Sequence, residues 1–125
     1  MVEKFRKILV VEDNRPLANA MHMKLRDRGY EVEEAHDGKE ALEKLEQDHI
    51  DLFLLDLIMP EMDGFSFLEE FNRRNVKAGV IVVSNVSDED NVKKLKDLGV
   101  SDYLIKSNYK LEEIVDKVDA YFQKK

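Results

Sequence analysis

Five short, mostly apolar runs alternate along the chain with segments whose apolar residues recur at helical spacing. The runs cover residues 8–11, 31–35, 52–55, 80–83 and 103–105. The central ones are apolar without alternation, which is typical of strands buried on both faces of a parallel sheet. Strands that alternate with helices in this way predict a doubly wound parallel sheet of the α/β class.

The helical segments between the runs carry start and stop signals. Asn14 has the position of an N-cap, and Gly29 supplies a stop after the first segment. The third segment opens at Gly64, and Ser87 and Asp90 have the spacing of a capping box before the fourth. Each run is thus followed by one helix, and the whole chain is a strict (βα)5 alternation.

Length and composition indicate a single domain, residues 1–125, with one core. The absence of cysteine excludes disulfides and thiolate metal sites. A formal net charge of −7 argues against non-specific binding to nucleic acid or to an anionic membrane. The first residues lack the apolar segment of a signal peptide, and no apolar run is long enough to span a membrane. We therefore expect a cytoplasmic protein.

Polar side chains follow four of the five runs, at the point where each run ends. Glu12 and Asp13 follow the first run, Asp56 the third, Ser84 the fourth and Lys106 the fifth. Ligands of open α/β sheets bind outside the carboxyl ends of the strands, where the strand order reverses. In the flavodoxin-like order 2-1-3-4-5, that point lies between strands one and three. We therefore expect these side chains to converge on one site.

Three neighbouring carboxylates repel one another unless a cation lies between them. Mg²⁺ prefers oxygen ligands and completes its shell with water and phosphate oxygens. We expect Asp13 and Asp56 to be direct ligands, and Glu12 to bind directly or through water. The backbone carbonyl of Ile58 is the candidate for a further ligand.

The same residues suit phosphoryl transfer. A carboxylate such as that of Asp56 can attack phosphorus and form an aspartyl-phosphate. The reaction needs alignment and charge stabilisation, which a metal ion and the ammonium of Lys106 can supply. The hydroxyl of Ser84 can donate a hydrogen bond to a phosphoryl oxygen.

Three motifs coincide with the ends of strands one, three and five. They are Val-Val-Glu-Asp-Asn at residues 10–14, Leu-Asp-Leu-Ile-Met-Pro-Glu-Met-Asp-Gly at residues 55–64, and Asp-Tyr-Leu-Ile-Lys at residues 102–106. Together they resemble the receiver domain of two-component response regulators, in its CheY-like form. The resemblance covers about residues 7–122 and implies five parallel strands flanked by five helices, in three α/β/α layers.

The resemblance also implies a function. Asp56 would accept a phosphoryl group from a histidine kinase or a histidine phosphotransfer protein, with Mg²⁺ required. Ser84 and Tyr103 would form the switch: the hydroxyl moves to the phosphoryl oxygen, and the aromatic ring rotates inward. The face made by helix four, strand five and helix five would then change its affinity for a downstream protein.

Some positions depart from the family pattern. Ser107 replaces the usual proline in a cis peptide, so we predict a trans Lys106–Ser107 bond and an altered loop. Asn85 replaces a small residue, and we expect it to crowd the phosphodonor. Ile58 and Val86 are apolar where the family controls attack by water, so we expect a long-lived phosphorylated form.

The leading hypothesis is a stand-alone receiver that switches or relays a phosphoryl group and is not an enzyme. The alternatives are a degenerate receiver, a haloacid dehalogenase-type phosphatase and a flavodoxin-like flavin carrier. The phosphatase needs an Asp-x-Asp pattern on strand one, which residues 12–15 lack. His22, His36 and His49 lack metal-ligand spacing, and we expect them at the surface.

Overall fold

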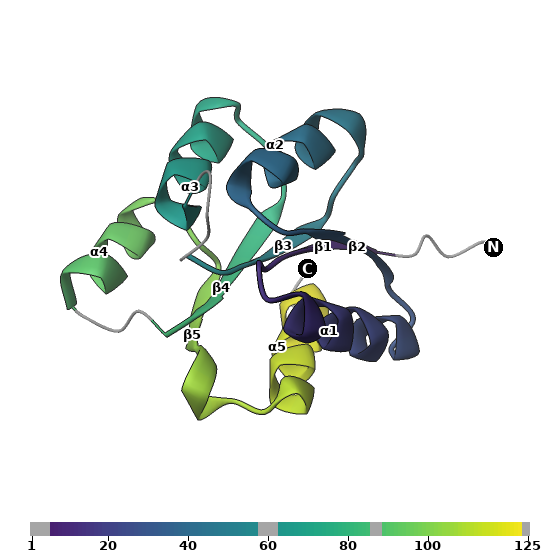
Figure 1. Cartoon of the computed structure of the whole chain (residues 1–125). Helices are drawn as coiled ribbons and strands as arrows, with labels where there is room; N and C mark the ends of the chain where they lie inside the picture. Colours follow the sequence, from purple (N-terminus) through teal and green to yellow (C-terminus); the bar gives the residue numbers. More distant parts are fainter. Residues whose placement is uncertain (1–5, 58–62, 86–88, 124–125) are drawn as a thin grey trace.

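The computed structural model, which describes residues 6–57, 63–85 and 89–123, has a five-stranded sheet with helices on both faces (Figure 1). Its elements are, in chain order, β1 (Lys7–Val11), α1 (Arg15–Asp27), β2 (Glu31–Ala35), α2 (Gly38–Gln47), β3 (Leu52–Leu55), α3 (Gly64–Arg73), β4 (Gly79–Ser84), α4 (Glu89–Asp97), β5 (Asp102–Ile105), the 3₁₀-helix η1 (Lys106–Asn108) and α5 (Leu111–Gln123). Every neighbouring pair of strands is parallel, in the order β2-β1-β3-β4-β5. The predicted fold class and strand order are confirmed.

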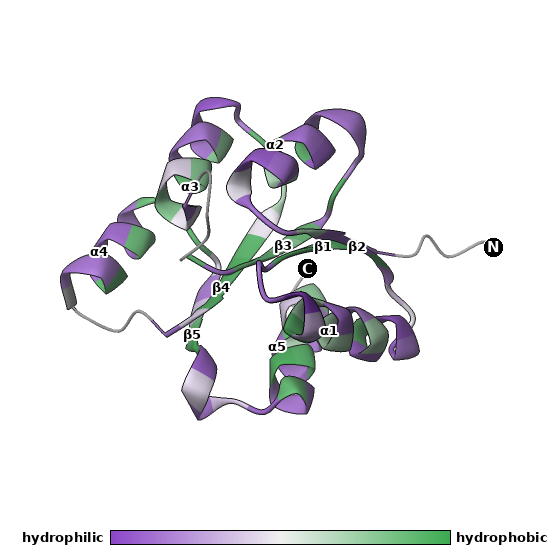
Figure 2. Cartoon of the chain, in the orientation of Figure 1, coloured by the Kyte–Doolittle hydropathy of each residue, from purple (hydrophilic) through white to green (hydrophobic). Residues whose placement is uncertain are grey.

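Two apolar clusters lie on opposite faces of the sheet and make three layers. One cluster joins β1 and β3 to α2, α3 and α4, and includes Leu9, Val11, Ala41, Phe53, Leu55, Phe67, Phe71 and Leu95. The other joins the opposite side of the same strands to α1 and α5, and includes Ile8, Val10, Leu25, Leu52, Leu54, Ile114 and Val118. The apolar stripes of the helices therefore face the sheet, and polar residues cover the outside (Figure 2).

The helix ends follow from local side-chain chemistry. Asn14 is the N-cap of α1, and its Oδ1 accepts a hydrogen bond from the backbone N–H of Leu17 at 3.0 Å. Asp63 caps α3 in the same way. Gly29 ends α1 with a φ of +96°, a conformation that glycine adopts without strain. These findings confirm the predicted signals at Asn14 and Gly29, whereas Ser87 lies outside the described residues.

The strand order puts β1 and β3 side by side, with their following helices on opposite faces. α1 packs in one apolar cluster and α3 in the other, so the chain leaves the two strands in opposite directions. This is the reversal point at which sheets of this kind bind ligands. None of the helices in the described ranges has both the length and the apolarity needed to cross a bilayer.

Candidate functional site

The register of β1 and β3 brings two of the predicted site residues together. Val11 is opposite Leu55, so Glu12 and Asp56 follow at the same level. The backbone N–H of Asp56 donates to the carbonyl of Val11 at 3.0 Å, which extends the strand pairing by one residue. The backbone of Asp56 is therefore fixed to the neighbouring strand, and this sets the position of its side chain.

Glu12, Asp13 and Asp56 form an acidic cluster. Each offers one carboxylate oxygen, and these oxygens all lie within 4.8 Å of one another. Glu12 and Asp56 are buried, with exposed fractions of 2% and 8%, whereas Asp13 is exposed. An all-oxygen set of this kind fits a hard divalent cation such as Mg²⁺, which keeps some of its water. The predicted convergence of these three residues is confirmed.

Lys106 follows β5, the edge strand of the sheet, and its side chain reaches the two buried carboxylates that follow β1 and β3. Its Nζ lies 2.7 Å from Oε1 of Glu12 and 3.3 Å from Oδ2 of Asp56. The residue begins η1, directly after β5, and its side chain is 23% exposed. Strand ends that are 94 and 50 residues apart in sequence from Lys106 thus meet at one ammonium group.

The electrostatics of the cluster depend on burial and on this ammonium group. Burial raises the pKa of Glu12 to about 7, although the hydrogen bond from Lys106 opposes the rise. Burial alone would lower the pKa of Lys106, but the carboxylates of Glu12 and Asp56 raise it. Lys106 therefore stays charged at neutral pH, and it offsets only part of the cost of burying Glu12.

Ser84 is the last residue of β4, and Tyr103 lies within β5, where it pairs with Val82. Ser84 is completely buried, and within the described part of the chain its hydroxyl oxygen has no hydrogen-bond partner. A buried hydroxyl without a hydrogen-bond partner lowers the stability of the folded protein, and it can donate a hydrogen bond to an oxygen that enters the site. Tyr103 is half-buried, packs against the α2–α4 side of the core, and has its hydroxyl oxygen shielded from solvent.

Gly64, the last residue of the second motif and the first of α3, packs against the backbone that carries Asp56. Its N–H donates to the carbonyl of Leu57 at 2.8 Å. A Cβ at this position would lie 2.7 Å from Cα of Leu57 and 2.9 Å from the carbonyl oxygen of Asp56. Only glycine lets α3 begin this close to the backbone that carries Asp56.

The remaining predicted positions fall into two groups. Ile58 and Val86 lie outside the described residues, so their roles stay predictions. Ser107 follows Lys106 in η1, and the described part of the chain has no cis peptide bond, which confirms the predicted trans bond. The predicted change in the loop stays a prediction. Asn85 is exposed, and its Oδ1 accepts a hydrogen bond from the N–H of Ser107 at 2.9 Å.

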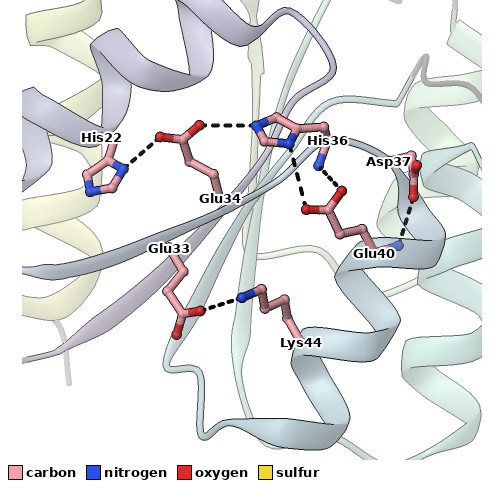
Figure 3. A network of polar contacts seen from close by, with 7 residues as sticks. All are labelled: His22, Glu33, Glu34, His36, Asp37, Glu40 and Lys44. Carbon is pink, nitrogen blue, oxygen red and sulfur yellow. Dashed lines mark hydrogen bonds and ion pairs between the residues drawn. The ribbon is translucent and has the colours of Figure 1, made fainter.

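The prediction of three surface histidines is correct only for His49, whose side chain is 79% exposed. His22 and His36 are half-buried, and Glu34 on β2 contacts both rings (Figure 3). Nδ1 of His22 lies 2.7 Å from one oxygen of Glu34, and Nε2 of His36 lies 3.1 Å from the other. Burial opposes the change, but these two hydrogen bonds lower the pKa of Glu34. Contacts between α1 and β2 are not visible as spacing in the sequence.

Comparison with known proteins gives the family. The model of the response regulator receiver domain matches residues 8–119. The chain belongs to this family. A response regulator from Staphylococcus saprophyticus, ArlR, is 34% identical over 119 residues. The match covers 94% of this chain but 53% of that protein, so the receiver spans about half the length of this relative.

Solved receiver structures agree with the fold. A CheY-like receiver domain protein from Methanospirillum hungatei is 25% identical, with a TM-score of 0.90 over 97% of this chain and 96% of that one. The receiver domain of a Francisella response regulator is 30% identical, with a TM-score of 0.86 over 95% and 98%. TrrA from Thermotoga maritima, solved with Mg²⁺ and BeF, is 28% identical, with a TM-score of 0.80 over 93% and 98%.

Proposed function

We propose that this receiver accepts a phosphoryl group on Asp56, in a Mg²⁺-dependent reaction, from a histidine kinase or a histidine phosphotransfer protein. The observation that carries the proposal is the contact of one ammonium group, that of Lys106, with the buried carboxylates of Glu12 and Asp56. A nucleophile, an acidic cation site and a fixed positive charge then lie within one hydrogen-bonded cluster.

The transfer step follows from the positions of these groups. An Oδ atom of Asp56 attacks phosphorus, the bond from phosphorus to the donor nitrogen breaks, and the imidazole of the donor leaves with the electron pair. The product is an acyl phosphate on Asp56. Lys106 stabilises the negative charge of the transferred group, because its Nζ already lies 3.3 Å from Oδ2 of Asp56. When bound by Glu12, Asp13 and Asp56, Mg²⁺ supplies further charge neutralisation.

The switch follows from the buried hydroxyl of Ser84. A phosphoryl oxygen on Asp56 would give this hydroxyl the partner that it lacks among the described residues. The bond would favour a second arrangement of the end of β4, and Tyr103 and the face formed by α4, β5 and α5 would change with it. The output is altered binding of a downstream protein, without turnover of a separate substrate.

The test uses beryllium fluoride, a stable phosphoryl mimic, together with Mg²⁺. We expect amide NMR signals of Ser84, Tyr103 and α5 to shift in the wild type. Ser84→Ala should still bind the mimic but should lose most of the shift at Tyr103, because the hydroxyl that carries the signal is missing. Shifts confined to Glu12 and Asp13, or full binding by Asp56→Asn, would contradict the proposal.

A further inference from the structure

Two of the positions at which the sequence departs from the family pattern contact each other. Asn85 directly follows Ser84 at the end of β4, and Ser107 directly follows Lys106 in η1. Oδ1 of Asn85 accepts a hydrogen bond from the backbone N–H of Ser107 at 2.9 Å. A proline at residue 107 could not donate this bond, because proline has no backbone N–H. The two unusual residues therefore form one interaction.

This hydrogen bond lies just beyond the last paired residues of β4 and β5. β4 and β5 pair up to the level of Ser84 and Ile105. Beyond that level the Asn85–Ser107 bond joins the two loops across 22 residues of sequence. One of these loops begins after the buried hydroxyl of Ser84, and the other begins with Lys106, whose side chain is held by Glu12 and Asp56.

The Asn85 side chain points toward the loop that follows β5. Oδ1 of Asn85 accepts its hydrogen bond from this loop, 2.9 Å from the backbone N of Ser107. Asn85 is exposed, so water competes with Ser107 for this hydrogen bond. Its effect on the site is then exerted through the backbone of Ser107, next to Lys106.

We propose that Asn85 is a positioning residue, which holds the backbone at Ser107 so that the ammonium group of Lys106 stays over Glu12 and Asp56. The inference rests on the proposed phosphorylation of Asp56. Asn85 touches none of the reacting atoms; it acts through the loop that carries Lys106.

The kinetic test measures the rate at which acetyl phosphate phosphorylates the protein in the presence of Mg²⁺. Asn85→Ala removes the acceptor, and Ser107→Pro removes the donor while leaving Asn85 in place. We expect each to slow the reaction by about 2- to 10-fold, the range for one neutral hydrogen bond. The double variant should be no slower than the slower single variant, because both remove the same bond.

The matched control is Ser107→Ala, which keeps the backbone N–H and should react at the wild-type rate. If Asn85 instead crowds the phosphodonor, Asn85→Ala will react faster than the wild type and Ser107→Pro will be unchanged. Either of these two results overturns the positioning role.

A second measurement, hydrogen exchange at the Ser107 amide in the unphosphorylated protein, does not depend on the reaction. Asn85→Ala should speed this exchange by at least 2-fold, whereas Asn85→Asp, which keeps an acceptor oxygen in place, should restore slow exchange. Exchange that Asn85→Ala leaves unchanged would overturn the positioning role alone. A wild-type protein that takes up no phosphoryl group would overturn the proposed function, and the positioning role with it.

Discussion

At the scale of single residues, the site depends on the balance between one partly buried ammonium group and two buried carboxylates. Lys106 lies 2.7 Å from Glu12 and 3.3 Å from Asp56, and the remaining positive charge must come from a metal ion or from the protonation of Glu12, whose pKa burial raises to about 7. Two buried carboxylates lower the stability of the folded protein when no metal ion is bound, and a bound metal ion stabilises them.

Replacing Lys106 by methionine tests two expected effects of its charge: stabilisation of the transferred phosphoryl group, and competition with Mg²⁺ for the carboxylates. The variant loses the charge that stabilises the transferred phosphoryl group, so phosphorylation by acetyl phosphate should slow by at least about 10-fold. Mg²⁺ should bind at least as tightly as in the wild type, because a competing cation has left the acidic cluster. Titration calorimetry measures the metal affinity, and Lys110→Met, at an exposed position nearby, is the control. An unchanged phosphorylation rate would show that Lys106 serves the structure only.

Residues of the site were predictable where a strand fixes them. Glu12, Asp56 and Ser84 each end a buried strand or directly follow one, and strand direction alone brings such positions to one edge. The Asn85–Ser107 bond was not predictable, because it depends on how two loops run after their strands end. The contact of His22 with Glu34 is likewise tertiary and was not predictable.

At the scale of elements, helices that pack closely against strand ends limit the size of the side chains that fit there. α3 begins against the backbone of Asp56 and Leu57, and α5 covers the opposite end of β4, where Tyr121 lies against Gly79. At both glycines a Cβ would come closer than 3.0 Å to a neighbouring atom, and neither residue has a positive φ. One of them borders the acidic cluster, and the other is at the far end of the sheet.

These two glycines make a matched pair of variants. Gly64→Ala places a methyl group against the backbone, which cannot move away, so we expect it to lower the free energy of unfolding by about 1–3 kcal/mol and to weaken Mg²⁺ binding. Gly79→Ala clashes with the ring and hydroxyl of Tyr121, which can shift, so it should lower stability by less and leave metal affinity unchanged. Urea unfolding and calorimetry on both variants provide the check. Equal metal affinities in the two variants would contradict the supporting role of Gly64.

β2 is the edge strand nearest the amino terminus, and charged residues cover it. Glu33 forms an ion pair with Lys7 and another with Lys44, the latter at 2.9 Å (Figure 3 shows the second pair). The hydrogen bonds from Lys7 and then Lys44 lower the pKa of Glu33 from its ordinary value of 4.5 to about 2. Charges on an edge strand also discourage pairing with a second sheet.

The lowered pKa of Glu33 predicts a pH dependence of stability. Because the folded protein binds the proton less well than the unfolded chain, the stabilisation is present above pH 4.5 and is lost as the pH falls toward 2. Glu33→Gln should therefore lower the free energy of unfolding by about 1 kcal/mol at pH 7, a value reduced by solvent screening, and should have almost no effect near pH 2. Urea unfolding across this range measures the difference. The control is Glu31→Gln, at an exposed position on the same strand, and a Glu33→Gln effect that persists at pH 2 would contradict the account.

At the scale of the whole molecule, the strand ends and the two apolar clusters connect the site to the helices. The core on the α2–α4 side packs against Tyr103, and β5 also contributes Leu104 to the α1–α5 side. A change at Ser84 and Tyr103 can therefore reach both layers. Moving a population from 1:99 to 99:1 requires a differential stabilisation of about 5.5 kcal/mol, which bonds from Ser84 and Lys106 to a phosphoryl group must largely provide.

The order of elements at this scale was predictable throughout, because apolar runs without alternation and one-sided helical spacing leave few other arrangements for residues 8–119. The identity of the partner was not, because it depends on the shape and charge of a surface and not on the strand ends that define the fold.

The most direct measurement is the intact mass of the protein after incubation with acetyl phosphate, with Mg²⁺ or with a chelator, for the wild type and for Asp56→Asn. The account predicts one added phosphoryl group in the wild type with Mg²⁺, and none with the chelator or in the variant. A phosphoryl group that Asp56→Asn still acquires, or a wild type that remains unmodified with Mg²⁺ present, would contradict it.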